Sequence, residues 1–406
     1  MSDYTHSLLP IRWADAPKPA YDVVIIGGGG HGLSTAYHLA TQHGITNVAV
    51  LEADYIASGN TGRNTTIIRA NYGIPESIRF YQHSLEKYQE LEEETGAAIL
   101  HETKGIVWLA HTEMAMRTER ARCAMNQSVG AKTYMRTPAE LKELVPQLDL
   151  TGGGRYPVLG GSHHVEGATA RHDRVAWAYA SLASQHGVDL FQHTTVTGLA
   201  RTADGGRVTG VETTRGPIAA GAVLSAVGGR VTQVAAMAGL RLPVRTHPLH
   251  AFVTNDYAPG GFSIILASTE LACYVSQTDR GQMLIGAEFD TQPSYSRQSS
   301  FSSLRSYSHK ITALLPFLRD LRILRSWAGI CDISVDFSPI MSATPVEGFY
   351  LTTGWGTWGF KAIPAGGEGM AELIATGRPP ALIAPFTLDR FRRDHVLADA
   401  GSTGTR

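Results

Sequence analysis

The chain has 406 residues, 43% of them hydrophobic, and its 35 basic and 36 acidic side chains give a formal net charge of -1. No basic block stands out, which argues against a nucleic-acid-binding protein. No apolar run reaches membrane-spanning length, and the N-terminus lacks the basic and apolar regions of a secretory signal. Three widely spaced cysteines argue against a disulfide framework and for a reducing compartment, so we expect cytoplasmic localisation.

The stretch Tyr21–Leu33, YDVVIIGGGGHGL, predicts a short buried strand that turns directly into a helix. Gly27, Gly29 and Gly32 have the spacing at which glycines allow the tight turn, the approach of a pyrophosphate and close helix–strand packing. The following strand, NVAVLE, ends at Glu52, about 20 residues after Gly32, where an acid can accept hydrogen bonds from ribose hydroxyls. Strand, helix, second strand and acid occur in order, which predicts a dinucleotide site.

Two later segments look like further pieces of the same nucleotide-binding domain. HDRVAWAYASLASQHG has helical apolar spacing, and Asp204-Gly-Gly between alternating runs is a hairpin signal. GFYLTTGWGTWGFKAIPAGGEGM reads as a strand, a glycine-rich loop and a helix. Between the pieces, HPLHAFVTNDY and LACYVSQTDRGQMLIGAEF alternate as sheet strands do, which indicates an inserted, sheet-rich second domain. The predicted ranges are 21–79, 151–239 and 326–385 for the nucleotide-binding domain, 80–150 and 240–325 for the second domain, and 1–20 and 386–406 for terminal extensions.

The three glycine-rich pieces, in this order, resemble the flavin-dependent amine oxidases of the D-amino-acid oxidase type. Within that superfamily, GNTGRNTTIIRANY, ATARHDRVAWAYA and GWGTWGFKAIPAGG resemble the β subunits of heterotetrameric sarcosine oxidases. The resemblance runs from about residue 10 to the C-terminus. It implies an α/β fold in which a FAD-binding, Rossmann-like domain is interleaved with a sheet-rich α+β substrate domain.

The resemblance also implies two flavins, a noncovalent FAD and a covalent FMN. In those β subunits a histidine at the position of His172 is bonded to the 8-methyl carbon of FMN. Taken alone, His172 reads as a helix cap, a surface residue or a satisfied core group, although a neutral imidazole is a nucleophile. The expected cofactor-binding residues are Gly27, Gly29, Gly30, His31, Gly32, Glu52, Asn60, Arg63, Asn64, Thr65, His172, Val196, Gly228, Gly354, Gly356, Gly359, Phe360 and Lys361.

Arg69 and Lys361 are the expected catalytic pair. An Arg can grip a carboxylate with two hydrogen bonds, and a Lys adds a compact positive charge. Considered alone, Arg69 could belong to a structural ion pair, and the Lys361 side chain could extend to the surface. In related amine oxidases the matching residues hold the substrate carboxylate over the flavin. Trp358 stands where a small residue is expected, and Ala362 and Ile363 also depart from the pattern, so the size of the pocket is open.

Other candidates carry weaker signals. Monomeric relatives attach FAD through a cysteine near the third segment, but the spacing of Cys331 is offset, which favours a small buried hydrophobe. His163, His164, His247 and His250 lack the spacing of a zinc site and read as lining or core groups, so no metal is expected.

The resemblance implies oxidation of sarcosine to glycine, with oxygen reduced to hydrogen peroxide. It also implies partner subunits, including a larger one with NAD and tetrahydrofolate sites, which are not visible in this chain. Two alternatives remain open. One is a stand-alone FAD oxidase or dehydrogenase of another N-methyl or secondary amino acid, and the other is a cofactor-carrying structural subunit.

Overall fold

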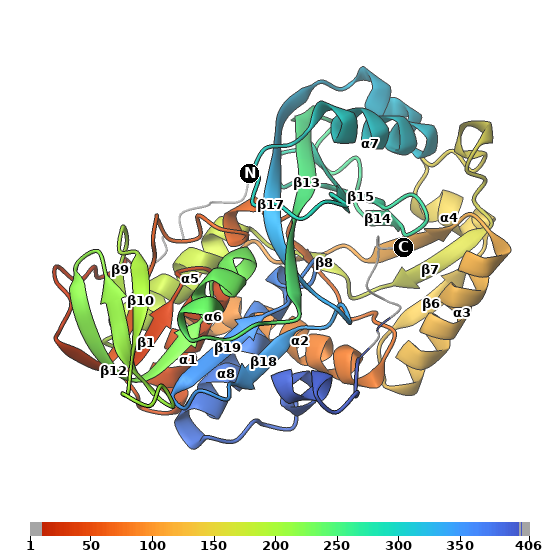
Figure 1. Ribbon diagram of the computed structural model, residues 1–406. Coiled ribbons are helices and arrows are strands. Elements are labelled where there is room, and N and C mark those ends of the chain that lie inside the picture. Colours follow the sequence, from red (N-terminus) through yellow and green to blue (C-terminus); the bar gives the residue numbers. More distant parts are fainter. Residues whose placement is uncertain (1–9, 398, 400–406) are drawn as a thin grey trace.

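Two large sheets organise the chain, as the computed structural model of residues 10–397 and 399 shows (Figure 1). The first sheet lies at the lower left of Figure 1 and the second at the upper right. Two long antiparallel strands, β13 (Val244–Asp256) and β17 (Ile323–Ser334), run side by side between the two halves. Each half is therefore built around its own sheet, with the long strands at the junction.

The first sheet has a parallel core in which β1 pairs with β2 on one side and β12 on the other. The inner residues of β1 are buried on both faces, which explains its continuous apolar run. Outside this core, β10 and β11 form the antiparallel hairpin. The strands of this sheet are β1 (Ala20–Ile26), β2 (Val48–Leu51), β9 (Asp189–Phe191), β10 (Val196–Arg201), β11 (Val208–Thr213), β12 (Gly216–Ser225), β18 (Ile340–Ala343) and β19 (Phe349–Thr353).

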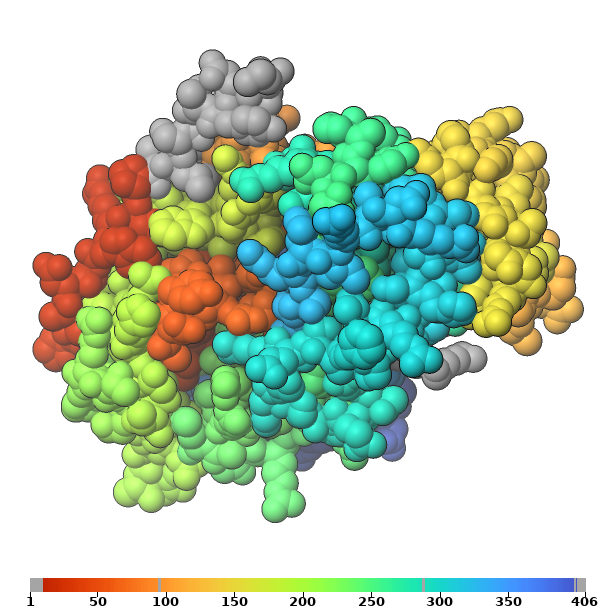
Figure 2. Space-filling view, turned by 90° about the horizontal axis from the view of Figure 1, so that it is seen from above, coloured from red at the N-terminus to blue at the C-terminus, as the bar shows by residue number. Residues whose placement is uncertain are grey.

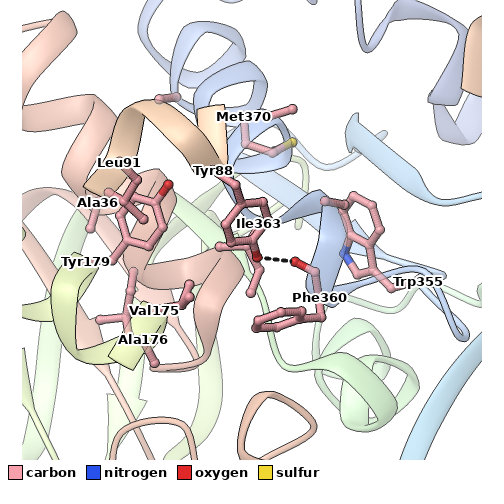
Figure 3. Packing of buried hydrophobic residues seen from close by; sticks show 14 of the residues in the cluster. Ala36, Tyr88, Leu91, Val175, Ala176, Tyr179, Trp355, Phe360, Ile363 and Met370 are labelled. Carbon is pink, nitrogen blue, oxygen red and sulfur yellow. Dashed lines mark hydrogen bonds between the residues drawn. The ribbon is translucent and has the colours of Figure 1, made fainter. Parts of the chain in front are cut away.

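Helices α1 (Gly30–Gln42), α2 (Pro75–Thr95), α5 (His172–Gln185) and α8 (Ile363–Thr376) share one hydrophobic core with the first sheet. Figure 3 shows this core, in which the Tyr88 hydroxyl donates to the Phe360 carbonyl at 2.5 Å. Helix α6 (Val231–Met237) contributes to a second core that contains Val24, Ala49 and Val223 of the central strands. The first sheet is therefore covered on both faces, as a parallel sheet requires.

The second sheet has the strand order β17-β13-β16-β15-β14-β5-β7-β6. Its other strands are β5 (Ile106–Ala110), β6 (Thr133–Arg136), β7 (Gly160–His164), β14 (Ile265–Ser268), β15 (Cys273–Gln277) and β16 (Gln282–Phe289). Helices α4 (Pro138–Leu144) and α7 (Phe301–Leu314) pack with one face of this sheet. Helix α3 (Glu113–Ser128) packs against β5, β6 and β7. A third, small sheet has the strand order β3 (Ile67–Ile68), β8 (Ala168–Thr169) and β4 (Glu102–Thr103). In Figure 2 the red N-terminal segment and the yellow segment around β6 lie at opposite ends of the molecule.

The expected fold class is confirmed, and so are the strand, helix and strand around the glycine loop. Strand β7 and most of β17 fall in the ranges 151–239 and 326–385, which were predicted for the nucleotide-binding domain, but both strands lie in the second sheet. Their partners are β5, β6 and β13, and such long-range pairing leaves no local pattern in the sequence. The domain division as a whole stays a prediction.

The N-terminal segment lies against α5, where the Pro10 carbonyl accepts from Gln185 at 2.9 Å and the Arg12 N–H donates to Ser184 at 3.0 Å. Residues 1–9, 398 and 400–406 of the predicted extensions lie outside the described part of the chain. Among the described residues, no helix combines the length and apolar character needed to cross a membrane.

Candidate functional site

A cavity of about 610 Å³ lies at the junction of the two sheets. Residues just after β1, β2 and β12 line it from the first sheet, and residues of β5, β13, β15 and β17 line it from the second. The carboxyl ends of parallel strands are where ligands bind in open α/β sheets. The cavity therefore has the position expected for the dinucleotide.

The glycine loop makes one wall of the cavity. Gly27 has a φ of 111°, and a Cβ on it would lie 2.5 Å from the Ala226 carbonyl oxygen. A Cβ on Gly32 would lie 2.1 Å from the Gly27 carbonyl oxygen, so this glycine allows the helix to pack against the turn. Gly29 and Gly30 line the cavity at the first turn of α1. Unpaired N–H groups of a helix N-terminus favour an anion, so this wall fits a pyrophosphate.

Glu52 lines the cavity, and its carboxylate also holds the glycine loop in place. Its Oε2 accepts from the Gly28 N–H at 2.9 Å, while Oε1 accepts from the Asp54 N–H at 3.0 Å and from the Ser58 hydroxyl at 3.3 Å. An ionised carboxylate has about four acceptor positions. Glu52 thus keeps acceptor capacity for a ribose hydroxyl while it holds the loop.

The segment from Asn60 to Thr65 forms a wall next to the glycine loop, and the Gly30 N–H donates to the Thr61 hydroxyl at 3.0 Å. Asn60 is tied to Ile330 of β17, and Arg63 donates to the carbonyls of Ser58 and Gly59. The Thr65 hydroxyl lies 2.7 Å from the hydroxyl of Tyr274 on β15. Side chains of this segment therefore join the nucleotide-binding half to the second sheet.

His31 lies on the inner side of the cavity, stacked on Trp355 with the ring centroids 4.1 Å apart. Its Nε2 donates to the Gly359 carbonyl at 2.9 Å. Burial lowers the pKa of His31 to about 3, so the ring is neutral at physiological pH. The neutral ring positions the glycine-rich turn that carries Lys361.

Arg69 and Lys361 both line this cavity, and both are buried. Nη1 of Arg69 donates to Asn71 Oδ1 at 3.0 Å, and Nζ of Lys361 donates to the Thr357 carbonyl at 3.0 Å. Burial, and secondarily the charge of Arg69, hold the pKa of Lys361 well below its usual value. When Lys361 is protonated, its charge and that of Arg69 repel each other, and an anionic ligand at this cavity surface would relieve the repulsion.

Arg69 is also held by aromatic faces. Its guanidinium carbon lies 4.2 Å from the Tyr72 ring centroid and 5.1 Å from that of Trp108. Arg122 lies 5.6 Å from the same Trp108 ring and is paired with buried Glu119 at 3.1 Å. Burial, with the charge of Arg122, lowers the pKa of Arg69, and Tyr72 and Asp399 partly offset this effect. The guanidinium is thereby fixed in orientation at the cavity.

Most of the expected cofactor-binding residues come together on the cavity surface. The described lining includes Gly27, Gly29, Gly30, His31, Glu52, Asn60, Arg63, Asn64, Thr65, Val196, Gly228, Gly356, Gly359, Phe360 and Lys361. Gly32, Gly354 and His172 are not part of it. Gly32 supports the turn from beneath, and the Gly354 N–H donates to Asp332 at 2.8 Å.

His172 is the first residue of α5, and this helix packs against the 3₁₀ turn Thr61–Arg63. That turn lines the cavity, so helix α5 contacts a segment of the cavity wall, while His172 itself is not among the lining residues. Within the described residues, the buried Nδ1 of His172 has no hydrogen-bond partner. Burial lowers the pKa of His172, which favours the neutral, nucleophilic imidazole.

Trp358 does not narrow the cavity. Its side chain is 2% exposed, is not among the described lining residues, and contacts Tyr72 and Tyr81 with centroid distances of 4.5 and 5.8 Å. Cys331 is a buried thiol that does line the cavity, and burial raises its pKa. The departure from the family pattern at Trp358 therefore changes the core beside Arg69.

Tyr274, Trp108 and Asp332 are among the lining residues that the sequence analysis did not identify. Tyr274 and Trp108 lie on strands whose alternation of apolar and polar residues is only partly visible in the sequence. They share one face of the sheet because β15 and β5 both pair with β14. Asp332 accepts from the Thr353 hydroxyl at 2.7 Å and holds the turn before Trp355. The sequence signal that could have identified Asp332 is its position as a lone acid inside the apolar run AGICDIS. In the described part of the chain, no group of three or more potential ligand side chains is arranged to hold a metal ion.

Comparison with known proteins agrees with this geometry. Residues 22–373 match the family described as DAO, FAD dependent oxidoreductase. The chain is 42% identical to sarcosine oxidase subunit beta of Arthrobacter sp over 96% of both chains. It is 43% identical to the Rhizobium meliloti protein of the same name, over 96% of this chain and 94% of that one.

A solved structure gives the same fold. The crystal structure of L-proline dehydrogenase from P. horikoshii superposes with a TM-score of 0.88 at 28% identity, covering 94% of this chain and 100% of that one. The expected cofactor FAD is thereby supported at the level of the family. The chain belongs to the DAO family of FAD-dependent oxidoreductases, within the group of sarcosine oxidase β subunits.

Proposed function

We propose that this chain catalyses the flavin-dependent oxidation of sarcosine to glycine. The observation that carries the proposal is the pair of buried cations, Arg69 and Lys361, on the surface of the cofactor cavity. The overall reaction consumes sarcosine, oxygen and water, and yields glycine, formaldehyde and hydrogen peroxide. Flavin, when bound, supplies the acceptor for the two electrons that leave the N-methyl group.

The side chains of the cavity bind and orient the substrate. Arg69 is already fixed by Asn71, Tyr72 and Trp108, so it can hold a carboxylate with little further loss of freedom. Lys361 lies on the glycine-rich turn beside His31 and Trp355, and it adds the second charge. With the carboxylate held, the amine end is fixed in orientation, which hydride transfer requires.

FAD fits the glycine loop, Glu52 and the segment from Asn60 to Thr65, because these residues offer helix N–H groups, a carboxylate and close backbone approach. FMN would be held at His172, whose buried Nδ1 has no partner within the described residues. We also propose that the chain works with other subunits, as the relatives' name "subunit beta" supports. The resemblance to that family further implies a larger subunit with NAD and tetrahydrofolate sites.

A second candidate is oxidation of another secondary amino acid. It is supported by the structural similarity to L-proline dehydrogenase, which has the same kind of carboxylate and secondary amine in its named substrate. We place either enzyme in the cytoplasm, in keeping with the three cysteines that are all free thiols.

The test is a product assay on the purified complex. We expect sarcosine to yield formaldehyde and glycine in equal amounts, with hydrogen peroxide formed at the rate of oxygen uptake. Faster turnover of L-proline than of sarcosine would favour the second candidate. Turnover of simple alkylamines that lack a carboxylate, at the rate found for sarcosine, would contradict both.

A further inference from the structure

One row of residues crosses the second sheet on the face that borders the cavity. The strand register aligns Trp108 with Ala267, Ala267 with Tyr274, Tyr274 with Gly286, and Gly286 with Ala251. Residues aligned in this way share one face of a sheet. Trp108, Tyr274 and Ala251 line the cavity, so the row forms part of its surface.

Gly286 is the position over which the Tyr274 ring lies. A Cβ on Gly286 would be 1.9 Å from the ring carbon Cζ and 2.1 Å from the hydroxyl oxygen of Tyr274. The backbone of Gly286 is outside the left-handed region, so its conformation is open to any residue. The ring, and not the backbone, therefore requires glycine here.

Thr65 holds the end of the same ring from the cofactor side. The two hydroxyl oxygens lie 2.7 Å apart, and both side chains are largely buried. Burial raises the pKa of Tyr274 to about 12, so its hydroxyl stays protonated over the physiological range. Tyr274 is thus pinned at its tip between a glycine on β16 and a threonine beside the cofactor.

We propose that Gly286 and Thr65, acting through Tyr274, set the size of the amine substituent that the cavity admits. The inference rests on the proposed function, in which the substrate carboxylate is held by Arg69. Arg69 lies 5.1 Å from Trp108, which is at one end of the row. The register places Tyr274 on the same face as Trp108, and both side chains line the cavity, so the Tyr274 ring that lies over Gly286 bounds the space next to the carboxylate site.

A methyl group at Gly286 would displace the Tyr274 ring from its position over Gly286 and into the cavity. The contact is with the far end of a side chain, so the ring can rotate and the sheet can remain intact. The displaced ring would also lose its bond to Thr65. Larger substrates would suffer first, because a cavity that loses the volume of a few methylene groups excludes them by steric overlap.

The experiment compares N-methyl-, N-ethyl- and N-propylglycine as substrates of the intact complex. We expect Gly286→Ala to lower kcat/KM for N-propylglycine relative to N-methylglycine by roughly tenfold or more. Thr65→Val, which frees the ring, should change this ratio in the same direction by a smaller factor. Tyr274→Ala, which removes the ring, should favour the larger substrates. Gly198→Ala on β10, where a Cβ would make an ordinary 3.5 Å contact, is the matched control.

A binding series separates this inference from the proposed function. Methoxyacetate and propoxyacetate are titrated into the flavin-loaded protein, and the visible flavin spectrum reports binding. Gly286→Ala should weaken propoxyacetate selectively. Unchanged size ratios in Gly286→Ala and in Tyr274→Ala, with sarcosine turnover intact, would overturn the inference and leave the proposed function standing. Absence of wild-type turnover with all three glycines would contradict the proposed function, while the inhibitor series would still decide whether the ring sets the size limit.

Discussion

Asn60 holds Ile330 by both ends of its side-chain amide. Nδ2 donates to the Ile330 carbonyl at 2.6 Å, and Oδ1 accepts from the Ile330 N–H at 2.9 Å. Asn60 precedes the Thr61–Arg63 turn, and Ile330 lies on β17 of the second sheet. This one side chain therefore fixes the distance between two walls of the cavity.

Replacing Asn60 with Ala should leave a backbone N–H and a carbonyl without their partner. The expected loss is about 1–3 kcal/mol in the free energy of unfolding, because unsatisfied buried groups cost that much. The measurement is denaturant unfolding of the flavin-loaded protein. Asn47, which makes a 3.4 Å bond to Asp22 at the surface, gives the control Asn47→Ala, with a change within about 0.5 kcal/mol. Equal losses of unfolding free energy in the two variants would contradict a stabilising role for the Asn60–Ile330 hydrogen bonds.

Glu52 should contribute more to FAD affinity than an acid that only accepts a hydrogen bond from the ribose, because Glu52 also holds the glycine loop. Glu52→Gln puts an amide NH₂ where the carboxylate now accepts from Gly28, Asp54 and Ser58, so the glycine loop loses a charge-assisted bond. We expect FAD affinity to fall by about 10- to 100-fold, which corresponds to roughly 1.5–3 kcal/mol. Equilibrium dialysis measures it, with exposed Glu212→Gln on β11 as the control. Unchanged affinity would mean that Glu52 does not organise the site.

His172 should carry the covalent flavin. The intact mass of the denatured wild-type chain should exceed the sequence mass by one FMN, and His172→Ala should abolish this increase while noncovalent FAD is retained. Retention is expected because His172 is not among the residues that line the cavity. His186, at the other end of α5, provides the control His186→Ala, which should keep the added mass. A wild-type chain with no added mass would sink this assignment.

Binding of simple carboxylates should weaken as pH rises. Burial lowers the pKa of Lys361, so the free protein loses the ammonium charge at a lower pH than an exposed lysine does. A carboxylate binds the charged form better and raises this pKa. Affinity is thus full below the free pKa and falls above it, by up to about tenfold per pH unit for one proton. Methoxyacetate is a suitable probe because it has no amine to titrate.

The control for this titration is the variant that lacks the titrating group. Lys361→Met should bind methoxyacetate weakly and should lose the pH dependence that the lysine gives, since Arg69 stays charged. Lys132→Met, which removes an exposed lysine paired with Glu166, should keep the wild-type profile. A wild-type affinity that is flat or rises with pH would contradict the role of Lys361.

Local patterns made the nucleotide half predictable. Gly27, Gly29, Gly32 and Glu52 belong to one strand–helix–strand unit, so their spacing alone indicated the turn and the acid that follows it. Arg69 and Lys361 were placed through resemblance, and the structure brings both to the cavity.

The second half of the site was harder to predict. Tyr274 faces the cavity because β15 pairs with β14 and β16, and Trp108 because β5 pairs with β14 in parallel. The strands β14, β15 and β16 follow one another in the chain, but β5 and β14 lie far apart in sequence, and such a pairing depends on the fold as a whole. Trp358 could not be placed either, because a tryptophan in a glycine-rich turn can face the core or the ligand, and here it packs on Tyr72.

The most direct test is anaerobic reduction of the bound flavin by sarcosine, followed by stopped-flow absorbance in wild type, Arg69→Met and Lys361→Met. Loss of one charged hydrogen bond to the carboxylate, worth about 1.5–3 kcal/mol, should raise the apparent Kd for sarcosine roughly 10- to 150-fold. The limiting reduction rate should also fall, because the amine end loses its orientation. Lys132→Met should reduce as wild type does. Wild-type Kd and reduction rate in both cavity variants would contradict the assignment of Arg69 and Lys361 as the carboxylate site.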